Sequence, residues 1–321
     1  TPYQPELSQG MLQAIFEYQS MICRLTGMEI SNASHYDSAT ALAEAVLLAL
    51  NVSNGRRDKI ILSPGVHPKH RQVVRTYLRG NKAQISEADD ISDDLAALVS
   101  MIDDNTAALV VQTPDFFGGV KDLRGLAESV NNRGALLIVA TDPIALGLFR
   151  APGEDMADIV VAEGQPLGIP MSFGGPHLGI FATRRDHLRR LPGRLVGETV
   201  DAAGRRGYVL TLATREQHIR RAKATSNICT NSALAAVAAA VYLATMGKTG
   251  LRQVAKLCYD RSNYAAQQIA ALPSVSVNPQ APDQPFFREF VVKLPIPVDE
   301  INDILFNDFG IFGGYDFGQD Y

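Results

Sequence analysis

Five short runs of almost uninterrupted Val, Ile, Leu and Ala limit most strongly how this chain can fold. They alternate with segments whose apolar residues recur at helical spacing, and each run is too short to be a buried helix. Strands that are apolar on both faces need a cover of helices on each side, which is typical of parallel sheets in α/β proteins. The pattern therefore predicts an α/β fold with a mostly parallel sheet, whose strands lie at residues 60–62, 107–111, 135–140, 159–161 and 178–182.

The character of the chain changes near Gly250. An apolar helix is expected at 232–246, capped by Asn231 and ended by Gly247. A second helix, two short strands and a last helix follow, so we expect a large domain with an N-terminal helix at 1–248 and a small C-terminal α/β domain at 249–321. The chain opens without Met and closes without a finishing helix, so we expect part of a longer polypeptide with a truncated small domain.

Charge and cysteine content argue against several classes of protein. The 30 Lys and Arg against 34 Asp and Glu leave a net charge of −4, which argues against a dedicated binder of nucleic acid or membrane surfaces. No uncharged apolar run reaches the ~18 residues of a membrane span. The 3 Cys residues include no Cys-x-x-Cys pair, which argues against a disulfide framework and favours a reducing compartment, the cytoplasm.

Candidate functional residues follow the predicted strands, because ligands of open α/β sheets bind at the carboxyl ends of the strands. Asp142 follows the strand at 135–140, as does the carboxylate that contacts the pyridinium nitrogen in pyridoxal-phosphate enzymes. A turn or helix cap before Pro143 also explains Asp142. Asp37 precedes a helix, where backbone N–H groups favour an anion, but a carboxylate there repels a phosphate and more often caps the helix.

Three further features each have more than one interpretation. The run 220–227 combines cations with short polar side chains, and it either grips an anion, forms a solvated face or contacts a subunit. His67 and His70 lie three residues apart, but Pro68 interrupts the helical face that a metal pair needs and no acidic partner is obvious, so we expect no metal. Cys229 is either a reactive thiol or a buried, inert one.

The motifs that the sequence lacks narrow its chemistry further. Gly-x-x-x-x-Gly-Lys, Gly-x-Gly-x-x-Gly, Gly-x-Ser-x-Gly and His-Glu-x-x-His do not occur. A working pyridoxal-phosphate enzyme needs a Lys after the strand that follows Asp142, and residues 162–179 contain none.

Five segments of the sequence are similar to one known family. They are 1–10 (TPYQPELSQG), 32–34 (NAS), 163–168 (EGQPLG), 173–179 (FGGPHLG) and 223–231 (KATSNICTN). The last two are long and specific, and the match runs through essentially the whole chain. The sequence resembles the glycine decarboxylase P-protein (glycine dehydrogenase, decarboxylating) of the glycine cleavage system, and within it subunit 1 of the two-subunit bacterial and archaeal form.

The resemblance implies a fold-type I pyridoxal-phosphate architecture with two homologous halves, of which only the other half carries the cofactor lysine. The position of that lysine falls here on Gln165, which cannot form a Schiff base. The site that Gln165 forms with Asp37 and Asp142 would then be vestigial. The family's phosphate loop usually continues with Glu-Gly-Thr, whereas this sequence has Ser38-Ala39-Thr40.

The resemblance also implies a reaction and partners. The family decarboxylates glycine on pyridoxal phosphate and passes the aminomethyl group to the lipoyl arm of the H-protein. The cofactor would lie in subunit 2 of an α2β2 heterotetramer, and this chain alone would hold no cofactor and no catalytic residue. Residues of this chain that are expected to reach the shared site are Tyr3, Gln4, Lys223, Thr225, Ser226, Asn227 and Thr230.

Two alternatives to this interpretation stay open. One is a non-enzymatic paralogue that serves as a scaffold or regulator. The other is a stand-alone pyridoxal-phosphate enzyme that uses a different lysine, for which Lys223 is the nearest candidate.

Overall fold

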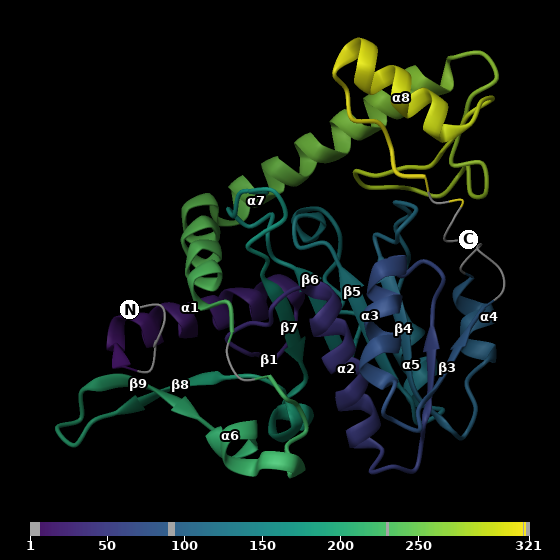
Figure 1. The fold of residues 1–321 in the computed structure, drawn as a ribbon. Coiled ribbons are helices and arrows are strands. Elements are labelled where there is room, and N and C mark those ends of the chain that lie inside the picture. The colour runs from purple at the N-terminus through teal and green to yellow at the C-terminus, as the bar shows by residue number, and fades with distance from the viewer. Residues whose placement is uncertain (1–6, 89–93, 229–230, 317, 319–321) are drawn as a thin grey trace.

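A seven-stranded sheet forms the centre of the molecule (Figure 1). The computed structural model describes residues 7–88, 94–228, 231–316 and 318. The sheet has the strand order β1-β7-β6-β5-β4-β2-β3. Its strands are β1 (Ile30–Ser31), β2 (Lys59–Leu62), β3 (Gln84–Glu87), β4 (Thr106–Thr113), β5 (Leu136–Thr141), β6 (Ile159–Glu163) and β7 (Gly179–Thr183).

The sheet is mostly parallel, which confirms the predicted fold class. Strands β3, β2, β4, β5 and β6 pair in parallel, whereas β7 runs antiparallel to both β6 and β1. All five predicted strands are present. The sequence pattern missed β3, because this strand at the edge of the sheet contains a single apolar residue, Ile85.

Helices cover both faces of the sheet, as the apolar strands required. In β4, Leu109 and Val111 join a core cluster with α1 (Gln9–Thr26), α5 (Leu126–Asn131) and α7 (Ala233–Ala270). Ala108 and Val110 point the other way, into a cluster with α2 (Ser38–Val52) and α3 (Pro68–Leu78). Alternate side chains of one strand thus enter two cores. The short helix α4 (Leu95–Ser100) completes the first cover through Leu98.

Helix α7 is bent at Gly247, where the sequence predicted a helix end. This residue has non-helical φ and ψ of 57° and −174°. Among the described residues, α7 is the one helix that is long and apolar enough to cross a membrane. Its first part ends at Met246 and spans about 21 Å at ~1.5 Å per residue, less than the ~30 Å of a bilayer core. Its inner side, with Ala236 and Ala239, packs in the core against the seven-stranded sheet.

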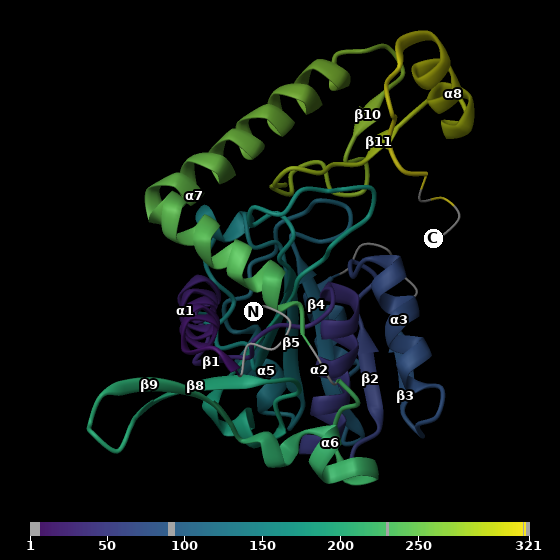
Figure 2. The ribbon, with the colours of Figure 1, turned by 60° about the vertical axis from the view of Figure 1, so that its left-hand side comes forward.

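The chain beyond α7 forms a smaller β/α unit (Figure 2). It contains β10 (Ser276–Val277), antiparallel to β11 (Val292–Lys293), and α8 (Val298–Phe309). The segment between these two strands returns to the loop that follows β4, where the backbone N–H of Phe287 donates to the carbonyl of Gly118 at 3.1 Å. The Phe287 side chain is fully buried in the large core. The division at 248/249 remains a prediction.

A hairpin that the sequence pattern did not reveal extends from the sheet (Figure 2). It consists of β8 (Leu195–Val200) and β9 (Arg206–Thr211), which pair with each other alone. Short helical turns connect the remaining segments: η2 (Ala145–Gly147), η3 (Arg185–Arg190), η4 (Ala213–Arg215), α6 (Gln217–Arg220) and η5 (Arg221–Lys223).

Candidate functional site: a cavity at the carboxyl edge of the sheet

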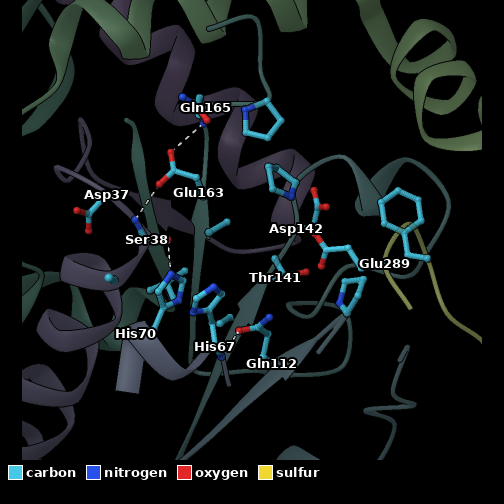
Figure 3. Close-up of a pocket in the computed structure, with 18 of the residues that line it drawn as sticks. Asp37, Ser38, His67, His70, Gln112, Thr141, Asp142, Glu163, Gln165 and Glu289 are labelled. Carbon is cyan, nitrogen blue, oxygen red and sulfur yellow. Dashed lines mark hydrogen bonds between the residues drawn. The ribbon is translucent and has the colours of Figure 1, made fainter. Parts of the chain in front are cut away.

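A cavity of about 460 Å³ lies beyond the carboxyl ends of β4, β5 and β6 (Figure 3). Its wall brings together the three predicted residues of the vestigial site, Asp37, Asp142 and Gln165. The start of α3 adds His67 and His70. The segment that returns from the smaller unit adds Phe287, Arg288 and Glu289. The cavity therefore lies at the edge where parallel strands place their ligands.

Asp37 caps helix α2, which is the interpretation that the sequence favoured. Its Oδ1 accepts a hydrogen bond from the backbone N–H of Thr40 at 2.7 Å. The Thr40 hydroxyl oxygen in turn accepts from the N–H of Asp37 at 3.3 Å, which completes a reciprocal capping box. The Asp37 carboxylate thus already accepts the hydrogen bond of one backbone N–H group at the start of α2, that of Thr40.

Glu163 supplies a second carboxylate at the same place. Its Oε2 accepts from the N–H of Ser38 at 3.1 Å, and its Oε1 accepts from the N–H groups of Gln165 at 3.0 Å and Leu178 at 2.9 Å. The imidazole Nδ1 of His177 lies 3.7 Å from Oε1. Sequence reasoning gave Glu163 no role, although its place at the end of β6, two residues before Gln165, was an available signal.

Asp142 forms a turn and an ion pair. Its Oδ1 accepts from the N–H of Ile144 at 2.8 Å, and its Oδ2 lies 2.8 Å from Nη2 of Arg288. Burial raises the pKa of the Asp142 carboxyl, and Arg288 opposes that shift. The sequence could not place Arg288 here, because it lies 146 positions further along the chain and reaches the cavity only through the tertiary fold.

The two histidines stack on each other at the floor of the cavity. Their rings are 4.9 Å apart, with planes inclined by 24°. His67 Nδ1 accepts from the N–H of Lys69, and His70 Nε2 lies 3.1 Å from the Ser38 hydroxyl. Burial and the neighbouring His67 lower the pKa of His70 to about 4.

In the part of the chain that the structure describes, no group of three or more His, Cys, Asp or Glu side chains is placed to hold a metal ion. One argument drawn from the sequence was wrong, since Pro68 does not interrupt a helix. Pro68 is the first residue of α3, and His67 caps it.

The residues of the cavity do not fit pyridoxal phosphate. Within the described ranges its lining contains no Lys, and Gln165 stands where the resemblance placed the cofactor lysine. A phosphate group would also need the N–H groups at the start of α2. Asp37 and Glu163 already accept from those of Thr40 and Ser38.

The residues predicted to reach a partner's site lie away from this cavity. Lys223 ends η5 and is exposed, and Thr225, Ser226 and Asn227 follow it outside the cavity lining. Ser226 is buried and hydrogen-bonds the Glu44 carboxyl of α2, whose burial raises its pKa to about 7. The remaining candidates, Tyr3, Gln4 and Thr230, fall outside the described residues, as does Cys229.

Comparisons with known proteins agree with this architecture. The family "Glycine cleavage system P-protein" matches residues 1–293. Two curated relatives are each named "Probable glycine dehydrogenase (decarboxylating) subunit 1". The one from Thermomicrobium roseum is 56% identical over 99% of this chain, and the one from Desulforamulus reducens is 54% identical over 100% of it. The chain spans 71% of the length of each relative.

Solved structures confirm the fold-type I architecture. An inhibitor-bound glycine decarboxylase (P-protein) of the glycine cleavage system has a TM-score of 0.84 and 46% identity, covering 95% of this chain and 68% of that one. A sphingosine-1-phosphate lyase from Burkholderia pseudomallei has a TM-score of 0.66 at 16% identity, and the match covers 94% of this chain and 69% of the lyase chain. At this identity the likeness shows the fold alone. The chain belongs to the glycine cleavage system P-protein family, as a relative of subunit 1 of decarboxylating glycine dehydrogenase.

Proposed function

We propose that this chain is the subunit of decarboxylating glycine dehydrogenase that lacks the cofactor lysine. Pyridoxal phosphate lies in the second subunit, where it supplies the electron sink for loss of the glycine carboxylate. The aminomethyl group then passes to the lipoyl arm of the H-protein. The assembly is an α2β2 heterotetramer of the cytoplasm. Gln165 carries this proposal, because an amide side chain in the wall of the cavity cannot form an imine.

Spectroscopy of the purified chain tests the proposal. We expect no Schiff-base absorbance after incubation with pyridoxal phosphate, and glycine–bicarbonate exchange only after the second subunit is added. Borohydride reduction followed by mass spectrometry checks the alternative of a stand-alone enzyme. A pyridoxyl adduct on Lys223 that disappears in Lys223→Ala would contradict the proposal. A complex that forms but leaves exchange at background would instead indicate a scaffold.

Gln165→Lys alone should not restore cofactor binding. The new amine can form an imine, but a phosphate would meet the carboxylates of Asp37 and Glu163 at the start of α2. Repulsion of about 4 kcal/mol from a single close charge pair, at an effective dielectric constant of ~20, already weakens binding by roughly three orders of magnitude. Absorbance titration with pyridoxal phosphate measures this. Affinity equal to that of the second subunit would mean that the carboxylates do not oppose the phosphate.

The second subunit covers an exposed apolar surface beside the cavity. The loop between β6 and β7 carries Met171 and Phe173 with 79% and 111% of their surface exposed. The backbone of Phe173 is left-handed, with φ of 58°, which costs ~1–2 kcal/mol for a residue other than Gly. The loop adjoins α7, where Gly168 packs against Tyr242. The exposed Val241 of α7 extends the surface. Apolar side chains held out in this way are typical of a subunit interface.

Phe173→Ser should weaken association with the second subunit by at least ~10-fold, since an aromatic anchor at an interface contributes ~1.4 kcal/mol or more. Sedimentation velocity of the mixed subunits measures the affinity. Phe312→Ser is the matched control, because Phe312 is also highly exposed, at 86%, but lies beyond α8. Equal affinity for the two variants would place the interface elsewhere.

A further inference from the structure

One carboxylate joins three segments of the chain at the vestigial site. Glu163 Oε2 accepts from Ser38 at the start of α2, and Oε1 accepts from Gln165 (Figure 3). Oε1 also accepts from Leu178, so it contacts both ends of the loop between β6 and β7. The N–H of Gly164 also donates to the carbonyl of Leu178 at 2.6 Å, which closes the base of this loop. The Glu163 side chain therefore holds α2 and both ends of the loop together.

These three N–H groups form an anion-binding arrangement. Helix α2 has 15 residues, and the N–H groups and dipole at the start of such a helix favour negative charge. Hydrogen bonds from N–H groups to a carboxylate are stronger than those between neutral groups. His177 Nδ1, 3.7 Å from Oε1, adds positive charge to the same position when its ring is protonated. Glu163 is thus bound as an anionic ligand would be.

We infer that Glu163 is an internal anion that takes the position of a ligand's phosphate and holds the start of α2 and both ends of the loop together without a cofactor. The inference rests on the proposed function in assigning no cofactor to this site. It makes Glu163 a positioning residue for Ser38 and for the loop that ends at Leu178. It also explains how the loop can present Phe173 to a partner while its base stays ordered in the isolated chain.

Glu163→Ala tests the inference, because it removes the carboxylate and leaves the three N–H groups without their acceptor. We expect the variant to bind inorganic phosphate at least tenfold more tightly than the wild-type chain, by isothermal titration calorimetry. Its melting temperature should fall by several degrees, and phosphate should recover at least half of that loss. Chloride at the same ionic strength should recover none. The wild-type chain should respond alike to phosphate and chloride.

Two further variants separate an anion effect from a general loss of structure. Glu163→Gln keeps the size and one carbonyl acceptor, so it should not gain phosphate binding. Glu128→Ala removes an exposed acid from the first turn of α5 and should not gain it either. If Glu163→Ala folds only in phosphate or formate, that rescue supports the inference equally. The inference is overturned if Glu163→Ala does not bind phosphate and is not stabilised by it.

The outcome is independent of the cofactor experiment, because it needs neither pyridoxal phosphate nor the second subunit. A Schiff base in the wild-type chain would refute the proposed function while the phosphate result could still be measured. Failure of Glu163→Ala to bind phosphate would refute the internal anion and leave the missing lysine at Gln165 unaffected.

Discussion

Gly118→Ala should lower the free energy of unfolding by about 2–5 kcal/mol, the sum of ~1–3 kcal/mol for overpacking and ~1–2 kcal/mol for a left-handed backbone. Gly118 has a φ of 91°, and a Cβ there would overlap the carbonyl oxygen of Glu289. Its own carbonyl accepts from the N–H of Phe287, the fully buried residue that joins the smaller unit to the large core. Relieving the overlap must displace this segment and Arg288 with it. Urea denaturation measures the loss.

Gly55→Ala is the matched control for this substitution. Gly55 has a similar φ of 73°, but nothing lies within 4 Å of its Cβ position. We expect it to lose only the ~1–2 kcal/mol cost of a left-handed backbone. If both variants lose the same amount, the close approach of Gly118 to Glu289 does not hold the two units together. Arg288 should then stay paired with Asp142 in Gly118→Ala.

Acid should destabilise the chain steeply between pH 6.5 and 3. Burial lowers the pKa of His35 to about 3 and that of His70 to about 4, with the charge of Asp37 opposing both shifts. Both rings are neutral when folded, whereas an unfolded His binds a proton below about pH 6.5. The contribution of the two histidines to the free energy of unfolding is therefore complete above pH 6.5 and is lost as the pH falls through this window. At ~1.36 kcal/mol per unit, the loss reaches about 4 kcal/mol for His35 by pH 3.

The slope of stability against pH is the measurement that isolates His35. Its ring stacks on Phe181, and its Nδ1 accepts from the Asn32 amide at 2.9 Å, so a proton on that nitrogen would break the contact. His35→Gln should flatten the slope below pH 6.5, whatever its effect at neutral pH. His218→Gln, at an exposed ring, is the matched control. A slope identical in His35→Gln and the wild type would mean that folding does not lower the pKa of His35.

Glu44 should act in the opposite direction. Burial raises the pKa of its carboxyl to about 7, although the hydrogen bond with Ser226 lowers it in part. Because the folded chain keeps this proton longer than the unfolded one, Glu44 contributes stability at low pH that is lost as the pH rises through 7. As the pH falls, Glu44 therefore adds stability while the two histidines remove it, and the measured slope is the sum of both effects.

Much of the large domain could be predicted from local pattern. The apolar runs predicted the strands, because a strand buried on both faces must be apolar at every position. Asp37 was expected to cap α2, since a cap depends on neighbours within one turn of helix, and Thr40 meets it there. The ligand site was expected at the carboxyl ends of the strands, and Asp142 and Gln165 both line the cavity there.

Contacts between distant segments were beyond local pattern. The direction of β7 depends on its pairing with β6 and β1, and nothing in its apolar run distinguishes parallel from antiparallel. The hairpin of β8 and β9 buries little, so its sequence alternates weakly. Arg288 reaches Asp142 only because Phe287 is buried in the large core.

The α/β class, the mostly parallel sheet and the lack of a lysine after β6 could be predicted from the sequence, because each depends on residue type and short-range order. What stands in the place of a ligand's phosphate depends instead on contacts between segments that are far apart in the chain. Glu163 looks like any strand-end acid until α2 and the loop before β7 bring the N–H groups of Ser38 and Leu178 to its carboxylate. Three donors from separate segments converge only after the chain has folded, and the sequence does not encode that convergence in any local pattern.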